Sequence, residues 1–200
     1  MVNMEKQSPS RFEMIKKRHK KTYEAALSQG KVDKPMESLC TFTAKTTNYY
    51  TSSCCSGRIM LLEKHGSKKC DNLFHRRWHR TVTFEELKEG VNESTKGKVW
   101  FKMEPFILHI GCGTIENAKK ILEAMQQAGV KRGGIILAGD EKFLIEMQGT
   151  ERMELIVKED GKNLVSDEYL KKILETANPM LENNFLRLKK FEKEFKKVLD

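Results

Sequence analysis

The sequence predicts an α+β fold with a mixed or antiparallel sheet, a central crossover helix and long N- and C-terminal helices. Three observations support this class: strand-like segments follow one another in meanders, one helical pattern interrupts them, and helical periodicity occupies both ends. From a length of 200 residues we expect a single domain over residues 1–200. We divide it into an N-terminal helix (10–28), a mixed α/β core (39–157) and a C-terminal helical stretch (166–199).

The first predicted helix begins at a capping box, because Ser10 and Glu13 have the spacing that satisfies two free backbone N–H groups. Apolar and aromatic side chains then recur at helical spacing as far as Leu27, and Gly30 ends the pattern. We expect residues 31–38 to be a polar linker around Pro35.

Residues 39–64 are rich in strand-forming side chains and predict strands in the segments LCTFT, NYYTS and GRIMLLEK. The basic, irregular composition of residues 65–80 predicts a loop. A second capping box, formed by Thr83 and Glu86, opens a short helix that extends to Glu89.

The segment KVWFKMEPFILHIG predicts two strands joined at Pro105, with alternate residues from Val99 to Met103 on one face. In the second of these strands, His109 shares a face with Ile107.

The crossover helix is expected to start after Thr114, which can cap it, and to end at Gly129. GIILA, KFLIEMQ and MELIVKE then predict three short strands. Ser166 caps the last helix, which Pro179 is expected to kink or split.

The stretch FILHIGCGTIENAKKIL, residues 106–122, has the strand, Gly-x-Gly turn and helix of a nucleotide-binding loop. A Rossmann fold requires alternating strands and helices, whereas here three strands follow the helix in succession. Ile115 stands where a third glycine is expected, and Asp140, the first carboxylate after the next strand, comes 27 residues after Gly113 rather than about 20. We therefore predict a fold that is not Rossmann.

The net charge of +9 is concentrated in clusters, notably KKRHKK, KKCDNLFHRRWHR and RLKKFEKEFKK. Lys and Glu rise together, as on the charge-rich surface of a heat-stable protein, but the cluster around Trp78 favours nucleic acid. Trp78 either stacks on an unpaired base or anchors the loop on the core. The candidate phosphate contacts are Lys68, Lys69, Arg76, Arg77 and Arg80.

Membrane and secretory features are absent from the sequence. It has no apolar run of about 18 residues, and MVNMEKQSPSRF has no signal-peptide core. Five cysteines without framework spacing indicate a reducing compartment. We expect a cytoplasmic protein with no membrane partner.

The segment YYTSSCCSGRI places five hydroxyl or thiol side chains, residues 52–56, directly before Gly57 and Arg58. Such a turn can direct N–H groups, hydroxyls and a guanidinium at a carboxylate or phosphate. The alternative is a hairpin turn with local serine hydrogen bonds.

This segment, extended to TTNYYTSSCCSGRIMLLEK, resembles the signature of the wybutosine-synthesis tRNA methyltransferase family, the third pathway enzyme in eukaryotes and its stand-alone archaeal counterparts. Aligned on Gly57, Cys55 matches the family cysteine and Cys54 replaces a serine. FKMEPFILHI, GVKRGGI, the N-terminal helix and the C-terminal stretch resemble the family as well, so the resemblance covers almost the whole chain.

The resemblance implies methyl transfer from S-adenosylmethionine to a ring nitrogen of the tricyclic base 3′ of the anticodon in tRNA-Phe, in a fold that is not Rossmann. It implies no particular oligomeric state. The candidate cofactor-binding residues are Ser52, Ser53, Cys55, Gly57, Arg58, His109 and Gly134, and the candidate catalytic residues are Glu104 and His79.

Plainer interpretations stand beside some of these roles. A histidine among apolar residues, such as His109, is often a satisfied core residue, and a carboxylate at a strand end, such as Glu104, is often merely exposed. Gly134 is equally compatible with a simple strand start.

The alternative function is a non-catalytic RNA-binding module with a structural zinc. His75 and His79 have H-x3-H spacing, and Cys54, Cys55 and Cys70 lie upstream of His79. There is no C-x-x-C, and a vicinal cysteine pair is awkward for one tetrahedral ion, so we expect no metal. A third possible function is that of a Rossmann methyltransferase that acts on small molecules.

Overall fold

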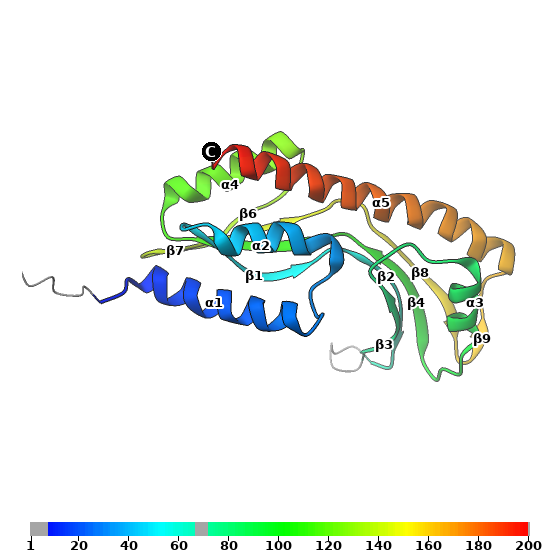
Figure 1. Ribbon diagram of the computed structural model, residues 1–200. Coiled ribbons are helices and arrows are strands. Elements are labelled where there is room, and N and C mark those ends of the chain that lie inside the picture. The colour runs from blue at the N-terminus through cyan, green and yellow to red at the C-terminus, as the bar shows by residue number, and fades with distance from the viewer. Residues whose placement is uncertain (1–7, 67–71, 200) are drawn as a thin grey trace, which may run out of the picture.

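The computed structural model describes residues 8–66 and 72–199 and forms two antiparallel sheets with five α-helices (Figure 1). The four-stranded sheet has the order β1-β5-β7-β6 and the five-stranded sheet the order β3-β2-β4-β8-β9. The strands are β1 (Tyr49–Cys55), β2 (Arg58–Lys64), β3 (Asn72–Trp78), β4 (Lys98–Glu104), β5 (Ile107–Cys112), β6 (Arg132–Gly139), β7 (Lys142–Gln148), β8 (Met153–Glu159) and β9 (Lys162–Asn163). The α+β class is confirmed, with two antiparallel sheets in place of one.

The helices are α1 (Arg11–Ser28), α2 (Glu37–Lys45), α3 (Phe84–Asn92), α4 (Ile115–Ala128) and α5 (Asp167–Lys197), with a short 3-10 turn at Lys34–Met36. The predicted capping boxes at Ser10 and Thr83 are both formed. Thr114 and Ser166 also accept hydrogen bonds from the first turns that they cap. Gly129 ends α4 in the left-handed conformation, so the helix boundaries follow from local side-chain chemistry.

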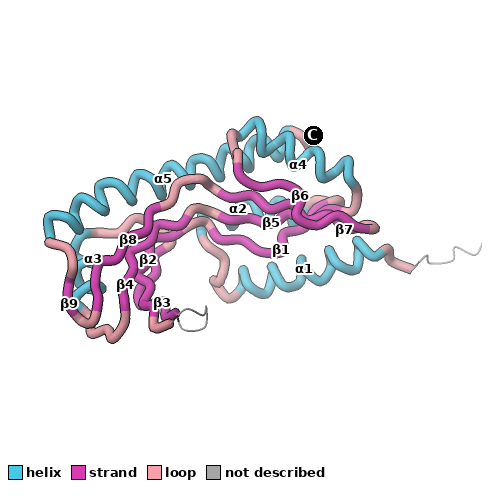
Figure 2. The backbone as a smooth tube through the Cα atoms, turned by 180° about the vertical axis from the view of Figure 1, so that it is seen from behind, coloured by secondary structure: helices cyan, strands magenta, loops and turns pink. Residues whose placement is uncertain are grey.

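The chain crosses between the two sheets from β1 to β2, from β4 to β5 and from β7 to β8. Figure 2 shows these connections as a seam that runs between the two groups of strands. The buried side chain of Asn184, in the middle of α5, lies at this seam. It accepts a hydrogen bond from the Phe106 N–H and donates one to the Ser56 carbonyl, both at 2.7 Å.

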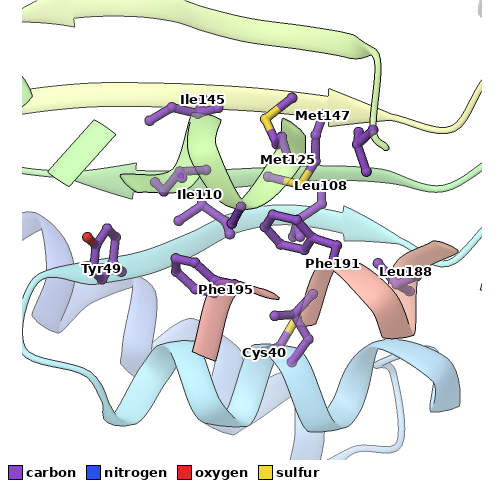
Figure 3. Close-up of a cluster of buried hydrophobic side chains, with 14 of the residues drawn as sticks. Cys40, Tyr49, Leu108, Ile110, Met125, Ile145, Met147, Leu188, Phe191 and Phe195 are labelled. Carbon is purple, nitrogen blue, oxygen red and sulfur yellow. The ribbon is translucent and has the colours of Figure 1, made fainter. Parts of the chain in front are cut away.

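Each sheet has its own hydrophobic core, and α5 contributes to both. Phe191 and Phe195, in the second half of α5, pack with Tyr49, Leu108 and other residues of the four-stranded sheet (Figure 3). The first half of α5 packs with the five-stranded sheet and α3 through a stripe that contains Leu170, Ile173, Leu174, Ala177 and Leu181. One helix therefore joins the two cores.

Two local predictions are wrong, and a third, that Pro179 kinks or splits the last helix, is contradicted as to the split. LCTFT is part of α2, because Leu39, Cys40, Thr43 and Ala44 are buried at helical spacing, and this packing outweighs the strand preference of its threonines. Residues 72–78 are strand β3, because antiparallel pairing with the apolar β2 orders a basic segment at a sheet edge. Pro179 does not split α5, since buried residues on both sides of it hold the helix against the cores.

Among the described residues, no helix is both long and apolar enough to cross a membrane.

Candidate functional site

A cavity of about 260 Å³ lies where α1 and the loop after it meet β1. β1 is an edge strand, and the register with β5 shifts between Thr51 and Ser53. This irregularity frees the Ser52 region from regular pairing, as a β-bulge does. The cavity is lined by His19, Thr22, Tyr23, Ala26, Lys31, Val32, Asp33, Thr51, Ser52, Ser53 and Cys54. Two predicted cofactor residues, Ser52 and Ser53, therefore face one hollow.

A polar centre of Asp33, Cys55 and His79 lies beside this cavity. The Asp33 carboxylate is 3.0 Å from Nδ1 of His79, and Cys55 Sγ is 3.9 Å from the same nitrogen. The backbone N–H of Ser56 donates to the same Asp33 oxygen at 2.8 Å. Three segments that are distant in sequence thus meet at one imidazole.

The pKa shifts of His79 and Asp33 favour the charged form of each side chain. The hydrogen bond to Asp33, with that to Cys55, outweighs burial and raises the pKa of His79 to about 9. Burial alone would raise the pKa of Asp33, but hydrogen bonds from His79 and the Ser56 backbone hold it below its ordinary value. At neutral pH the pair is therefore a carboxylate and an imidazolium.

The ligand atoms of Asp33, Cys55 and His79 lie within 4.8 Å of one another, which is a spacing that a divalent transition metal can use. A metal requires a neutral imidazole and would have to displace the proton that His79 shares with Asp33. The raised pKa of His79 opposes this at neutral pH.

Of the zinc ligands considered for the alternative function, Cys55 and His79 are brought together, with 3.9 Å between Cys55 Sγ and Nδ1 of His79, whereas His75 and Cys54 are not part of this cluster. His75 Nε2 lies 2.9 Å from the Gly90 carbonyl and 3.0 Å from Glu93, on the α3 side of β3. Cys54 packs against the hydrophobic core instead, and Cys70 lies outside the described residues.

The turn from β1 to β2 requires its glycine. Gly57 has φ = +92°, and a Cβ there would lie 2.7 Å from Asn184 Nδ2 and 2.9 Å from the Glu104 carbonyl oxygen. No other residue has both the backbone freedom and the small size that this crossing needs. Asn184 was missed in the sequence, although it is a polar residue at a core position of α5, between Leu181 and Leu188.

Arg58, directly after this turn, forms an ion pair with Glu104. Its Nε and Nη2 donate to Oε2 of Glu104 at 3.2 and 2.9 Å. The guanidinium also lies over the ring of Phe74, 5.0 Å from the centroid. A predicted cofactor residue and a predicted catalytic residue are therefore in direct contact on neighbouring strands.

A row of polar residues also crosses the four-stranded sheet, from β1 through β5 to β7. His109 Nε2 lies 2.8 Å from Oε2 of Glu146, and the register pairs His109 with Ser53 and Glu146 with Gly134. A Cβ on Gly134 would meet nothing within 4 Å, so the fold itself does not require this glycine. Glu146 was missed, and its only sequence signal is a polar side chain that alternates with apolar ones.

The predicted nucleic-acid contacts have different environments. Arg76 is paired with Glu93 and Arg80 with Glu86, whereas Arg77 is exposed. Trp78 packs against the core of the five-stranded sheet, which supports its interpretation as an anchor. Lys68 and Lys69 lie outside the described residues. Asp33, which pairs with His79 in the polar centre, was not predicted as a site residue, because a single carboxylate in a polar linker forms no recognisable sequence pattern.

Comparison with known proteins finds relatives that match this chain over nearly its full length. Residues 11–197 match the profile of the family described as Methyltransferase TYW3. A Pyrococcus abyssi protein named tRNA(Phe) 7-((3-amino-3-carboxypropyl)-4-demethylwyosine(37)-N(4))-methyltransferase 1 is 33% identical over 188 residues, covering 94% of this chain and 97% of the relative. A Pyrococcus horikoshii protein with the same name is 35% identical over 182 residues, covering 90% of this chain and 93% of the relative.

The fold is similar to that of a solved protein. The structure of the PH1069 protein from Pyrococcus horikoshii superimposes with a TM-score of 0.86 at 34% identity and covers 92% of this chain and 95% of that chain.

Proposed function

Because the chain belongs to the methyltransferase family TYW3, it is a tRNA methyltransferase, and we propose that it methylates a ring nitrogen of the tricyclic wyosine-type base 3′ of the anticodon in tRNA-Phe, with S-adenosylmethionine as the donor. One observation carries this proposal. Relatives named for N(4) methylation of a demethylwyosine in tRNA(Phe) match this chain over almost their whole length.

We propose that the donor occupies the cavity between α1 and β1. Its volume of about 260 Å³ is slightly below the range of about 300–1,000 Å³ that is usual for small-ligand sites. The hydroxyls of Ser52 and Ser53 and the free backbone edge of β1 suit the ribose and amino-acid groups of the donor. The other predicted cofactor residues do not line this cavity: Cys55, Gly57 and Arg58 follow Ser53 along the chain, His109 pairs with Ser53 in the sheet, and Gly134 pairs with Glu146.

When bound, S-adenosylmethionine supplies an electrophilic methyl carbon. The residues of the chain must then align the acceptor nitrogen and receive the proton that the base loses. His79 is protonated at neutral pH, because its pKa is about 9, so we assign it the donation of a hydrogen bond to the base. Both hydrogen bonds from Arg58 go to Oε2 of Glu104, so we assign proton acceptance to Oε1 of Glu104.

We propose that the tRNA lies along the basic hairpin of β2 and β3. The clustered charge of this region complements a phosphate backbone. Arg76 and Arg80 are engaged with carboxylates, which makes the exposed Arg77 the strongest of the predicted contacts within the described residues.

The test is transfer of a labelled methyl group from S-adenosylmethionine to tRNA-Phe that carries the demethylwyosine precursor. We expect incorporation into this tRNA and none into tRNA-Phe with an unmodified guanosine at the same position. Calorimetric titration of the protein with S-adenosylmethionine should show binding at one site. Absence of both incorporation and donor binding would contradict the proposal.

A further inference from the structure

Phe74 is an exposed aromatic residue in the middle of the edge strand β3. Its exposed fraction is 52%, although the strand pairs with the apolar β2. Two guanidinium groups lie near its ring: Cζ of Arg58 is 5.0 Å and Cζ of Arg77 is 5.4 Å from the centroid. We refer to Arg58, Phe74 and Arg77 as the Phe74 surface.

The Phe74 surface lies on the face of the five-stranded sheet that is opposite the hydrophobic core formed with α3 and α5. Phe74 pairs with Leu62 and Arg77 pairs with Met60, whereas the intervening Leu61 belongs to the core beneath α3 and α5. Side chains alternate between the two faces of a strand. Core packing therefore does not account for an aromatic residue at position 74, and a ligand that stacks on its ring would.

The charges around the ring specify the kind of ligand. Arg58 is paired with Glu104, but within residues 8–66 and 72–199 Arg77 forms no ion pair. The surface thus combines an aromatic side chain that is about half exposed with a guanidinium that no described carboxylate neutralises. This combination suits an unpaired nucleotide, whose base stacks on the ring and whose phosphate accepts hydrogen bonds.

Two members of the Phe74 surface lie close along the chain to residues of the candidate site. Arg58 follows directly on the Gly57 turn, and β3 ends at Trp78, directly before His79. A nucleotide on Phe74 would lie along the same strand that leads to the polar centre. An anticodon loop presents several unpaired bases side by side, so a neighbour of the modified base can reach such a surface.

We propose that the Phe74 surface is a stacking platform for an unpaired anticodon-loop nucleotide that neighbours the methylated base. This inference rests on the proposed function. It explains why a phenylalanine is exposed in the middle of β3 and why two arginines lie near its ring.

The experiment compares Phe74→Ala, Phe74→Trp and the wild-type protein in binding to a fluorescently labelled tRNA-Phe anticodon stem–loop, followed by anisotropy. Loss of one base–aromatic stack should weaken binding about 5-fold to 100-fold in Phe74→Ala. Phe74→Trp should bind as tightly as wild type, because it retains an aromatic face. Affinity for S-adenosylmethionine should be the same in all three proteins.

Tyr169→Ala is the matched control, since Tyr169 is also an aromatic residue with a 52% exposed fraction, but it lies on α5. This variant should bind the stem–loop like wild type. Equal binding by Phe74→Ala and wild type would overturn the platform, as would a Phe74→Trp variant no better than Phe74→Ala. Failure of the wild-type protein to bind the stem–loop at all would instead count against the proposed function.

Discussion

The Asp33 carboxylate lies 3.0 Å from Nδ1 of His79 and joins the loop after α1 to the residue that follows β3. Asp33 also lines the cavity beside β1. One charge pair therefore connects a wall of the proposed donor site with the strand proposed to carry the tRNA. Its strength depends on pH, because the protonated form of His79 is the one that Asp33 stabilises.

We predict that this pair makes stability fall as the pH rises from about 6.5 to about 9. The pKa of His79 is about 9 in the folded protein against an ordinary value of 6.5, so the folded state retains a proton that the unfolded state loses. The stabilisation is complete below pH 6.5 and is lost as the pH rises through 9. Urea unfolding at a series of pH values should show the free-energy difference between wild type and His79→Gln shrinking across this interval.

Asp33→Asn is the companion variant for this measurement, because it removes the carboxylate that pairs with His79. The free-energy difference between wild type and Asp33→Asn should shrink over the same interval, since the raised pKa of His79 depends first on Asp33. Parallel profiles for wild type and His79→Gln would contradict the assigned ion pair.

We predict that Arg58→Lys lowers kcat/KM for methyl transfer about tenfold or more. A lysine ammonium cannot reproduce the two directed hydrogen bonds that Arg58 gives to Glu104, and a charged hydrogen bond contributes about 1.5–3 kcal/mol. Initial rates with the precursor tRNA provide the measurement. Arg80→Lys keeps the positive charge of an exposed arginine that is paired with Glu86 rather than with Glu104, and it should leave the rate within about twofold. Unaltered methylation by Arg58→Lys would exclude the proposed role.

We predict that Asn184→Leu destabilises the protein by about 2–4 kcal/mol. The change leaves the Phe106 N–H and the Ser56 carbonyl at the seam without their partner. Asn183→Leu places the same substitution on the exposed side of α5 and should cost less than about 0.5 kcal/mol. Denaturant unfolding of both variants gives the comparison, and equal midpoints would show that Asn184 does not hold the seam.

The same experiment tests our proposal that residues 1–200 form one domain. Because α5 supplies side chains to both cores, we expect fluorescence and circular dichroism to report one coincident transition. Two separated transitions would contradict the single-domain proposal.

The features that the sequence predicted well are local ones. Ser10, Thr83 and Ser166 cap helices because the cap depends on residues three positions away, and such spacing is readable in a single chain. The alternation from Val99 to Met103 was readable for the same reason. The turn at Gly57 was predicted because it is formed by adjacent residues, and Gly57 has the positive φ that a glycine allows in such a turn.

The features that the sequence did not reveal depend on long-range contacts. LCTFT is a helix because α2 buries Leu39 and Cys40 in the core that α5 completes, and local strand preference could not anticipate that partner. The ion pair of Asp33 and His79 joins residues 46 positions apart in the chain (79 − 33), and no local motif encodes it. Likewise, Arg76 and Arg80 pair with glutamates of the α3 region, and these pairs depend on the way in which α3 packs beside β3.

We predict that Arg77→Gln reduces the salt dependence of tRNA binding, whereas Arg80→Gln does not. A side chain that contacts a phosphate releases counterions when the complex forms, so its loss lowers the slope of log K against log salt by about 0.7–0.9. Arg77 is exposed and stacked over Phe74, whereas the charge of Arg80 is already offset by Glu86. Anisotropy titrations of the anticodon stem–loop at several salt concentrations measure both slopes. If Arg80→Gln changed the slope as much as Arg77→Gln, intramolecular pairing would not decide which arginines reach the RNA, and the basic cluster would bind as an undifferentiated surface.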